Sequence, residues 1–113
     1  MNYDIGRLSD TTFQPFPHPA DPSLSAGEFA WIREGKAQFW RGTEDTMPQV
    51  APYPFARAEI IHVIEGAVDI EMPDGEVIHL GVGDVGAFDQ NIDTTWRFTF
   101  PFTKLSVFPE DDA

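Results

Sequence analysis

A carboxylate and an imidazole interrupt the most apolar segment of this 113-residue sequence. Glu59 and His62 lie within Ala58–Ile64, whose remaining side chains are all apolar. A carboxylate in such a strand is costly unless it is paired, hydrogen-bonded, bound to a metal or protonated. Glu59 is therefore the candidate catalytic residue, as an acid–base group, or the carboxylate that binds an amine. Without a partner, burial would raise its pKa toward neutrality.

Other reactive side chains form no catalytic pattern. The sequence has no cysteine, which excludes a thiolate nucleophile, a disulfide framework and a cysteine-based metal site. Ser23, Ser25 and Ser106 have no nearby His–Asp pattern. Gly81-Val82-Gly83 is too short for a dinucleotide-binding motif and leads into an expected strand.

Residues 28 to 109 have the periodicity and the turn signals of strands. Apolar and polar side chains alternate in Trp96–Phe100, which predicts one buried and one solvated face. Asp74-Gly75 and Glu34–Lys36 each predict a hairpin turn. No window of helical length has a 3.6-residue period, so we expect an all-β domain of the sandwich or barrel type.

The sequence divides into two parts by composition. Residues 1–27 form a proline-rich arm, in which four prolines between positions 15 and 22 exclude a continuous helix or a central strand. Two arrangements are open for this arm. It is a loose segment, or its aromatic side chains pack on the domain or on a second subunit. Residues 28–113 form the single domain. Ile60–Ile64 is apolar on both faces, and together with the arm this segment predicts a homodimer.

The formal net charge of −12, from 7 basic and 19 acidic residues, limits the partners. Nucleic acids and anionic membrane surfaces need a basic face that displaces counterions, so we expect neither as a partner. The apolar runs are too short to span a membrane, and the N-terminus has no basic segment followed by an apolar core. We therefore expect a cytoplasmic protein.

Four parts of the sequence resemble a known family. Glu59-Ile-Ile-His-Val-Ile-Glu-Gly66 resembles the end of the first cupin motif, in which the Glu is a metal ligand and the Gly closes a turn. Leu80–Phe88 resembles the start of the second motif, in which Gly-Asp opens a strand. Trp40 and Thr94-Thr95-Trp96 resemble the small cupins of the ureidoglycine aminohydrolase-like and ethanolamine-utilisation branch. The resemblance covers residues 29–108 and implies the cupin fold, an RmlC-like jelly roll in which a double-stranded β-helix forms a barrel.

The resemblance does not extend to the metal site. Metal-binding cupins place His-x-His before the Glu and a further His after it. The first two positions fall within Pro52–Phe55, which contains no histidine, and the later position falls on Thr94. If Glu59 points into the barrel, strand alternation points His62 out of it. A single carboxylate cannot hold Mn, Fe, Ni or Zn, which take three or four protein ligands. We expect no metal and no other cofactor.

The resemblance also implies a cavity inside the barrel. A jelly-roll barrel leaves a space lined by alternate residues of its strands. We expect an aromatic cup with one or two carboxylates and a few hydroxyl groups, lined by Trp40, Tyr53, Glu59, Ile61, Val68, Asp89, Thr94, Trp96 and Phe98.

Three functions are open for such a barrel. The first is a metal-free protein that binds a small organic molecule in the cup. The second is an enzyme of ureide or amino-compound metabolism, similar to the aminohydrolases, with Glu59 as acid–base group or metal ligand. The third is a structural subunit in which Trp40, Trp96 and Phe98 fill the barrel as core.

Overall fold

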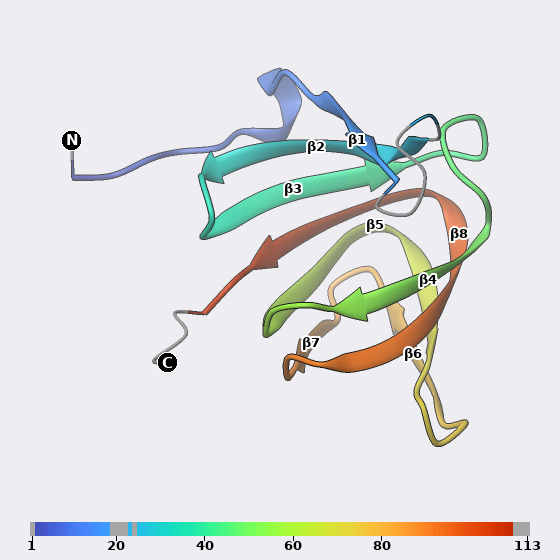
Figure 1. Ribbon diagram of the computed structural model, residues 1–113. Helices are drawn as coiled ribbons and strands as arrows, with labels where there is room; N and C mark the ends of the chain where they lie inside the picture. The colour runs from blue at the N-terminus through green and yellow to red at the C-terminus, as the bar shows by residue number, and fades with distance from the viewer. Residues whose placement is uncertain (1, 19–22, 24, 110–113) are drawn as a thin grey trace.

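Antiparallel strands form nearly the whole of this protein, which confirms the predicted all-β class. The computed structural model describes residues 2–18, 23 and 25–109. Figure 1 shows a short 3-10 helix, Leu8–Asp10, followed by strands that curve around a common interior. The strands are β1 Gln14–Pro17, β2 Ser25–Arg33, β3 Ala37–Gly42, β4 Val50–Phe55, β5 Glu59–Glu71, β6 Val77–Gly81, β7 Val85–Phe88 and β8 Ile92–Val107. The described residues include no helix with the length and hydropathy that a membrane crossing requires.

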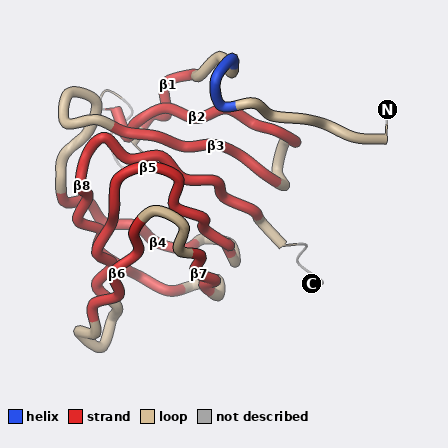
Figure 2. The backbone as a smooth tube through the Cα atoms, turned by 180° about the vertical axis from the view of Figure 1, so that it is seen from behind, coloured by secondary structure: helices blue, strands red, loops and turns tan. Residues whose placement is uncertain are grey.

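The long strands β5 and β8 join two layers because each contributes to both. The second half of β8 pairs with β3 and with the first half of β5, beside which β7 lies. These strands, with β1 and β2, are called the β3 layer. The first half of β8 pairs with β4 and with the second half of β5, beside which β6 lies; this group is the β4 layer. Figure 2 shows β5 and β8 curving together from one layer into the other.

Gly66 marks the bend of β5 between the layers. The resemblance implied that this glycine closes a turn, but it lies inside β5 with a φ of 75°, where the register against β8 shifts. A Cβ atom at this position would collide with the carbonyl oxygens of Thr99 and Pro101 on β8. The irregularity also changes which residues face inward, from Val63 before it to Val68 after it.

Both hairpin turns lie where the sequence predicts them. Gly35 joins β2 to β3 with a φ of 76°, and Gly75 joins β5 to β6 with a φ of 92°. These left-handed values favour glycine, which has no Cβ atom to clash. The strand before the first turn is longer than expected, since β2 begins at Ser25, inside the range assigned to the arm.

The described part of the arm lies on the domain, which is one of the arrangements that the sequence left open. β1 pairs antiparallel with β2, and the ring of Phe16 contacts that of Phe29 edge-on, with centroids 5.3 Å apart. The guanidinium of Arg41 lies 3.6 Å from the centroid of the Phe13 ring. β1 is an edge strand, the position in a sheet that tolerates proline. The arm residues at 19–22 lie outside the described residues.

The inward faces of the two layers form one aromatic core. Tyr53 stacks on Trp96 with centroids 4.1 Å apart, and Phe55 stacks on Phe88 at 4.7 Å. Such pairs add stability beyond the apolar area that they bury. The buried cluster comprises Trp40, Met47, Phe55, Ile61, Val63, Val68, Ile70, Leu80, Phe88, Trp96, Phe98 and Phe102.

The outer face of β5 is partly apolar. Ile60 is half-buried and pairs in register with Val107 of β8 and Ala87 of β7, while the exposed His62 pairs with the exposed Val85. The homodimer that the sequence predicts for this segment stays a prediction.

Candidate functional site

A buried ion pair lies between the two layers. Glu59, the first residue of β5, is only 3% exposed, and Lys104 of β8 is 1% exposed. The Nζ atom of Lys104 lies 2.7 Å from Oε2 of Glu59. The sequence analysis singled out the carboxylate but missed this lysine, which supplies the partner that a buried carboxylate requires.

Two hydroxyl groups complete the hydrogen bonding of this pair. Ser106 donates from its Oγ to Oε2 of Glu59 at 2.6 Å, and Tyr53 donates from its hydroxyl to Oε1 at 2.7 Å. Lys104 in turn donates to the Ser106 Oγ, and to the Tyr53 hydroxyl at 3.4 Å. The carboxylate therefore accepts three hydrogen bonds, and the ammonium group has an acceptor for each of its three protons. We call these four residues the Glu59 cluster.

Strand register brings the four side chains together. In the β3 layer Lys104 pairs with Val63 and Ser106 with Ile61, so both face inward on the side of Glu59. Tyr53 comes from β4 in the opposite layer. The cluster therefore links the two layers across the interior of the barrel.

Thr94 and Trp96 hold Tyr53 in place. Thr94 lies opposite Tyr53 in register and donates from its Oγ1 to the Tyr53 carbonyl at 2.6 Å. The indole Nε1 of Trp96 donates to the same Oγ1 at 2.9 Å, and the Trp96 ring stacks on that of Tyr53. Thr94 thus has a structural role at the position where the family motif would place a histidine ligand.

The ion pair keeps Glu59 ionised. Burial by itself raises the pKa of Glu59, but the charge of Lys104 and the hydrogen bonds from Lys104, Ser106 and Tyr53 together outweigh it, so the pKa is lowered. Burial, with the negative charge and hydrogen bond of Glu59, raises the pKa of the Tyr53 hydroxyl well above its ordinary value. The shift toward neutrality expected for an unpaired Glu59 does not occur, because the carboxylate is paired.

We expect acid to remove the stability that the Glu59 carboxylate contributes. Because folding lowers its pKa, this contribution is complete above the ordinary value of 4.5 and is lost as the pH falls through the lower pKa of the folded state. Urea unfolding from about pH 7 to about pH 3 is expected to show that the difference in the free energy of unfolding between wild type and Glu59→Gln shrinks in acid, as the Glu59 carboxylate takes up a proton. A difference that stays constant over this range would contradict the lowered pKa.

A cavity of about 290 Å³ lies beside the cluster, inside the barrel. The rings of Trp40, Tyr53 and Trp96 line it, and each lies between 5.4 and 5.6 Å from Lys104 Nζ. The indole of Trp40 is itself held by a hydrogen bond to the carbonyl of Ala26 at 2.9 Å. The full lining is Phe16, His18, Ala26, Gln38, Trp40, Met47, Ala51, Pro52, Tyr53, Pro54, Ala56, Trp96, Phe98 and Lys104.

The structure brings together some of the residues expected to line the cup and separates others. Trp40, Tyr53, Trp96 and Phe98 line the cavity. Glu59 lies behind this wall, bonded to Tyr53 and Lys104, while Ile61, Val68 and Thr94 are buried in the surrounding core. Asp89 is exposed in the loop before β8, away from the cavity wall.

Lys104 and Gln38 are wall residues that the sequence analysis missed. Extending the alternation of Trp96 and Phe98 by three further steps along β8 places Lys104 on the inward face. Lysine is seldom fully buried, so the residue type argued against an inward-facing, buried position. Gln38 lies two residues before Trp40 on the same face of β3, and the same extension would have found it.

The donor set at this site does not suit a transition metal. Pro52 and Pro54 offer no side-chain donor, the Tyr53 hydroxyl is bonded to Glu59, and Thr94 is bonded within the core. The ammonium of Lys104 places a positive charge against the one remaining carboxylate. Across the part of the chain that the structure describes, no three His, Cys, Asp or Glu side chains are grouped to hold a metal ion.

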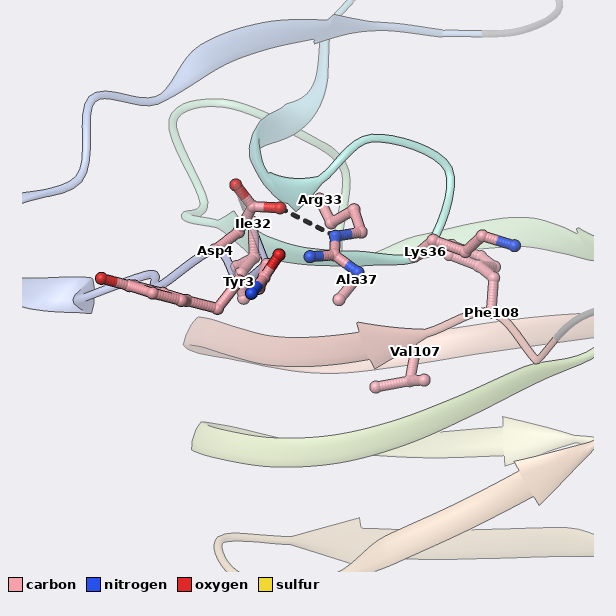
Figure 3. Close-up of a pocket in the computed structure, with 9 residues that line it drawn as sticks. Tyr3, Asp4, Ile32, Arg33, Lys36, Ala37, Val107 and Phe108 are labelled. Atoms are coloured by element: carbon pink, nitrogen blue, oxygen red, sulfur yellow. Dashed lines mark hydrogen bonds and ion pairs between the residues drawn. The ribbon is translucent and has the colours of Figure 1, made fainter.

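A larger recess of about 540 Å³ lies outside the barrel, between the N-terminal segment and the hairpin of β2 and β3 (Figure 3). Its ion pair joins Arg33 to Asp4 at 2.7 Å, and both side chains are about half exposed. Exposed pairs of this kind contribute little to stability or binding. The Glu59 cluster lies elsewhere, so the smaller cavity is the candidate site.

Comparison with known proteins identifies the fold. A family model described as the EutQ-like cupin domain matches residues 49–105. A solved structure of KdgF from Halomonas is 18% identical, with a TM-score of 0.62 over 98% of both chains. A protein of unknown function from Rhizobium leguminosarum is 23% identical, with a TM-score of 0.57 over 86% of this chain and 98% of that one.

A third similar structure is a DUF861-family protein from Thermotoga maritima, at 18% identity and a TM-score of 0.56 over 63% of this chain and 76% of that one. No protein of curated function matches the sequence. At such low sequence identity, the similarity to these structures shows the fold alone. It confirms the predicted jelly roll.

Proposed function

Because this chain belongs to the family of EutQ-like cupin domains, we propose that its barrel binds a small organic molecule without a transition metal. The observation that carries the proposal is the aromatic cavity of about 290 Å³ beside the internally neutralised pair of Glu59 and Lys104. This volume lies at the lower end of the range for small-molecule sites, so the ligand is small.

The aromatic walls favour a ligand with a flat, apolar body. Trp40 and Phe98 have ring centroids 5.6 Å apart, and Trp96 lies 5.8 Å from Phe98 on the same wall. These rings present apolar faces against which a planar group can pack. The remaining space favours binding over a structural subunit whose barrel is filled by its own side chains.

Lys104 makes a metal unnecessary for balancing the charge of Glu59. Its ammonium already lies 2.7 Å from the carboxylate, so an added cation would meet a like charge rather than an unpaired anion. This contact, and the absence of histidine from Pro52–Phe55, support the metal-free alternative.

The geometry supports binding rather than acid–base catalysis by Glu59. The carboxylate lies behind the cavity wall and accepts hydrogen bonds from Tyr53, Lys104 and Ser106. Its lowered pKa makes it a weak base, whereas an acid–base group works best with a pKa near the working pH. The aminohydrolase-like alternative lacks the free carboxyl group that it needs.

A thermal-shift screen with ureides, amines, sugars and small aromatic compounds tests the proposal. At about ten times its Kd, a ligand is expected to stabilise the folded state by ~1.4 kcal/mol and to raise the Tm by about 5 °C. Ala51→Phe fills the cavity and is expected to abolish the shift. Ala87→Phe adds the same ring on the exposed outer side of β7. This matched control is expected to show the same ligand-induced rise in Tm as the wild type. Hits that survive Ala51→Phe would place the ligand elsewhere and refute the proposal.

A further inference from the structure

Gln38 is a buried polar residue whose side chain lines the cavity. It lies in β3 and is only 6% exposed. Within the residues that the structure describes, its side-chain amide makes no hydrogen bond. The amide still reaches open space, because among the described residues every fully buried side-chain nitrogen and oxygen atom has a hydrogen-bond partner. A ligand that fills the cavity would remove this amide from water, and it would then have to supply the missing hydrogen bonds.

The polar groups of Lys104, Tyr53 and Trp40, which line the same cavity, are already hydrogen-bonded. The Lys104 ammonium is bonded to Glu59, Ser106 and Tyr53, and the Trp40 indole N–H is bonded to a backbone carbonyl. These groups have no donor left for a ligand. The Gln38 amide, by contrast, brings an unused donor and an unused acceptor to the cavity.

Strand register places this amide beside the Glu59 cluster. Gln38 pairs with Ser106 of β8, and Trp40, two residues further along β3, pairs with Lys104. The amide therefore lies near the polar side of the cavity, while Trp40, Trp96 and Phe98 supply apolar walls. A ligand that packs its body against the rings can reach Gln38 with its polar end.

On the basis of the proposed function, we infer that Gln38 selects an uncharged ligand that carries a carboxamide or lactam group on a planar body. A primary amide side chain offers N–H and C=O side by side, so it pairs with a group that presents an acceptor beside a donor. Carboxamides and lactams have this pattern. The charges of Glu59 and Lys104 cancel each other, and a charged ligand would find no unpaired countercharge there.

Four phenyl compounds that differ in their polar group test this inference. Benzamide, benzoate, benzylammonium and toluene are titrated into the wild-type protein by calorimetry, alongside Gln38→Leu and the control Gln90→Leu, whose glutamine is exposed in a loop. Benzamide is expected to bind wild type and Gln90→Leu about tenfold more tightly than Gln38→Leu. Toluene is expected to bind Gln38→Leu at least as tightly as wild type. Gln38→Met, which keeps an unbranched side chain, replaces Gln38→Leu if that variant does not fold.

The outcomes separate the inference from the proposed function. Benzoate or benzylammonium binding as tightly as benzamide would overturn the selection for an uncharged group. Equal benzamide affinity in wild type and Gln38→Leu would overturn the role of Gln38, while toluene binding would still support a ligand cavity. If none of the four compounds binds at millimolar concentration, both the inference and the proposed cavity are refuted.

Discussion

Replacing Lys104 with methionine is expected to lower the free energy of unfolding by about 3–5 kcal/mol. Methionine keeps most of the length and apolar volume of the lysine stem but removes the charge that faces Glu59 at 2.7 Å. The carboxylate would then remain buried with only two hydroxyl donors, Ser106 and Tyr53. An uncompensated buried charge is far more costly than the loss of the attraction itself.

A double-mutant cycle shows whether the loss comes from the pair. Adding Glu59→Gln to Lys104→Met removes the uncompensated charge, so the double variant is expected to be more stable than Lys104→Met alone. Arg33→Met, which breaks the half-exposed pair with Asp4, is the matched control and is expected to cost at most about 1 kcal/mol. Urea unfolding followed by tryptophan fluorescence measures the wild type, Glu59→Gln, Lys104→Met, the double variant and Arg33→Met. A Lys104→Met variant no less stable than Arg33→Met would show that burying the ion pair does not make the loss of Lys104 costly.

Replacing Gly66 with alanine is expected to cost about 3 kcal/mol or more, because two effects add. At a φ of 75° an L-residue is strained, and its Cβ would also collide with the Thr99 and Pro101 carbonyl oxygens on β8. Backbone atoms of a paired strand cannot move aside as a flexible side chain can. β5 must therefore shift away from β8 at the point where both strands pass between the layers.

Gly75→Ala provides the comparison that separates strain from crowding. Gly75 has a φ of 92°, but no atom lies within 4 Å of a Cβ built there, so only the backbone strain of about 1–2 kcal/mol applies. Thermal and urea unfolding of the two variants are compared with wild type. If Gly66→Ala and Gly75→Ala lose the same free energy of unfolding, β8 does not crowd Gly66, and the bend then needs another explanation.

Local patterns predicted much of this fold. Alternation identified the strand around Trp96, and the glycines in both hairpins mark turns because few other residues tolerate a positive φ. The bend at Gly66 could not be read in the same way. Its cause is the close approach of a strand that lies more than thirty residues away in the sequence.

The candidate site was predictable in part. A carboxylate in an apolar strand needs a partner, so Glu59 stood out. Tyr53 and Thr94 were expected near it from the spacing of the resemblance, and the structure places them opposite each other in register. Asp89 shows the limit of that approach, since a loop residue has no alternation to decide whether it faces inward.

By itself, the sequence determined the all-β class, the positions of the hairpins, the aromatic interior and the need of Glu59 for a partner. Each of these follows from periodicity, turn chemistry or the cost of burying charge, which act over a few residues. Only the tertiary structure decided that the partner is Lys104, 45 residues further along the chain, and that the pKa of Glu59 is lowered rather than raised. It also decided that Gln38 lines the cavity, where its amide forms no hydrogen bond with any residue that the structure describes. Such contacts depend on which strands become neighbours and in what register, and the pairing of distant strands cannot be read from either strand alone.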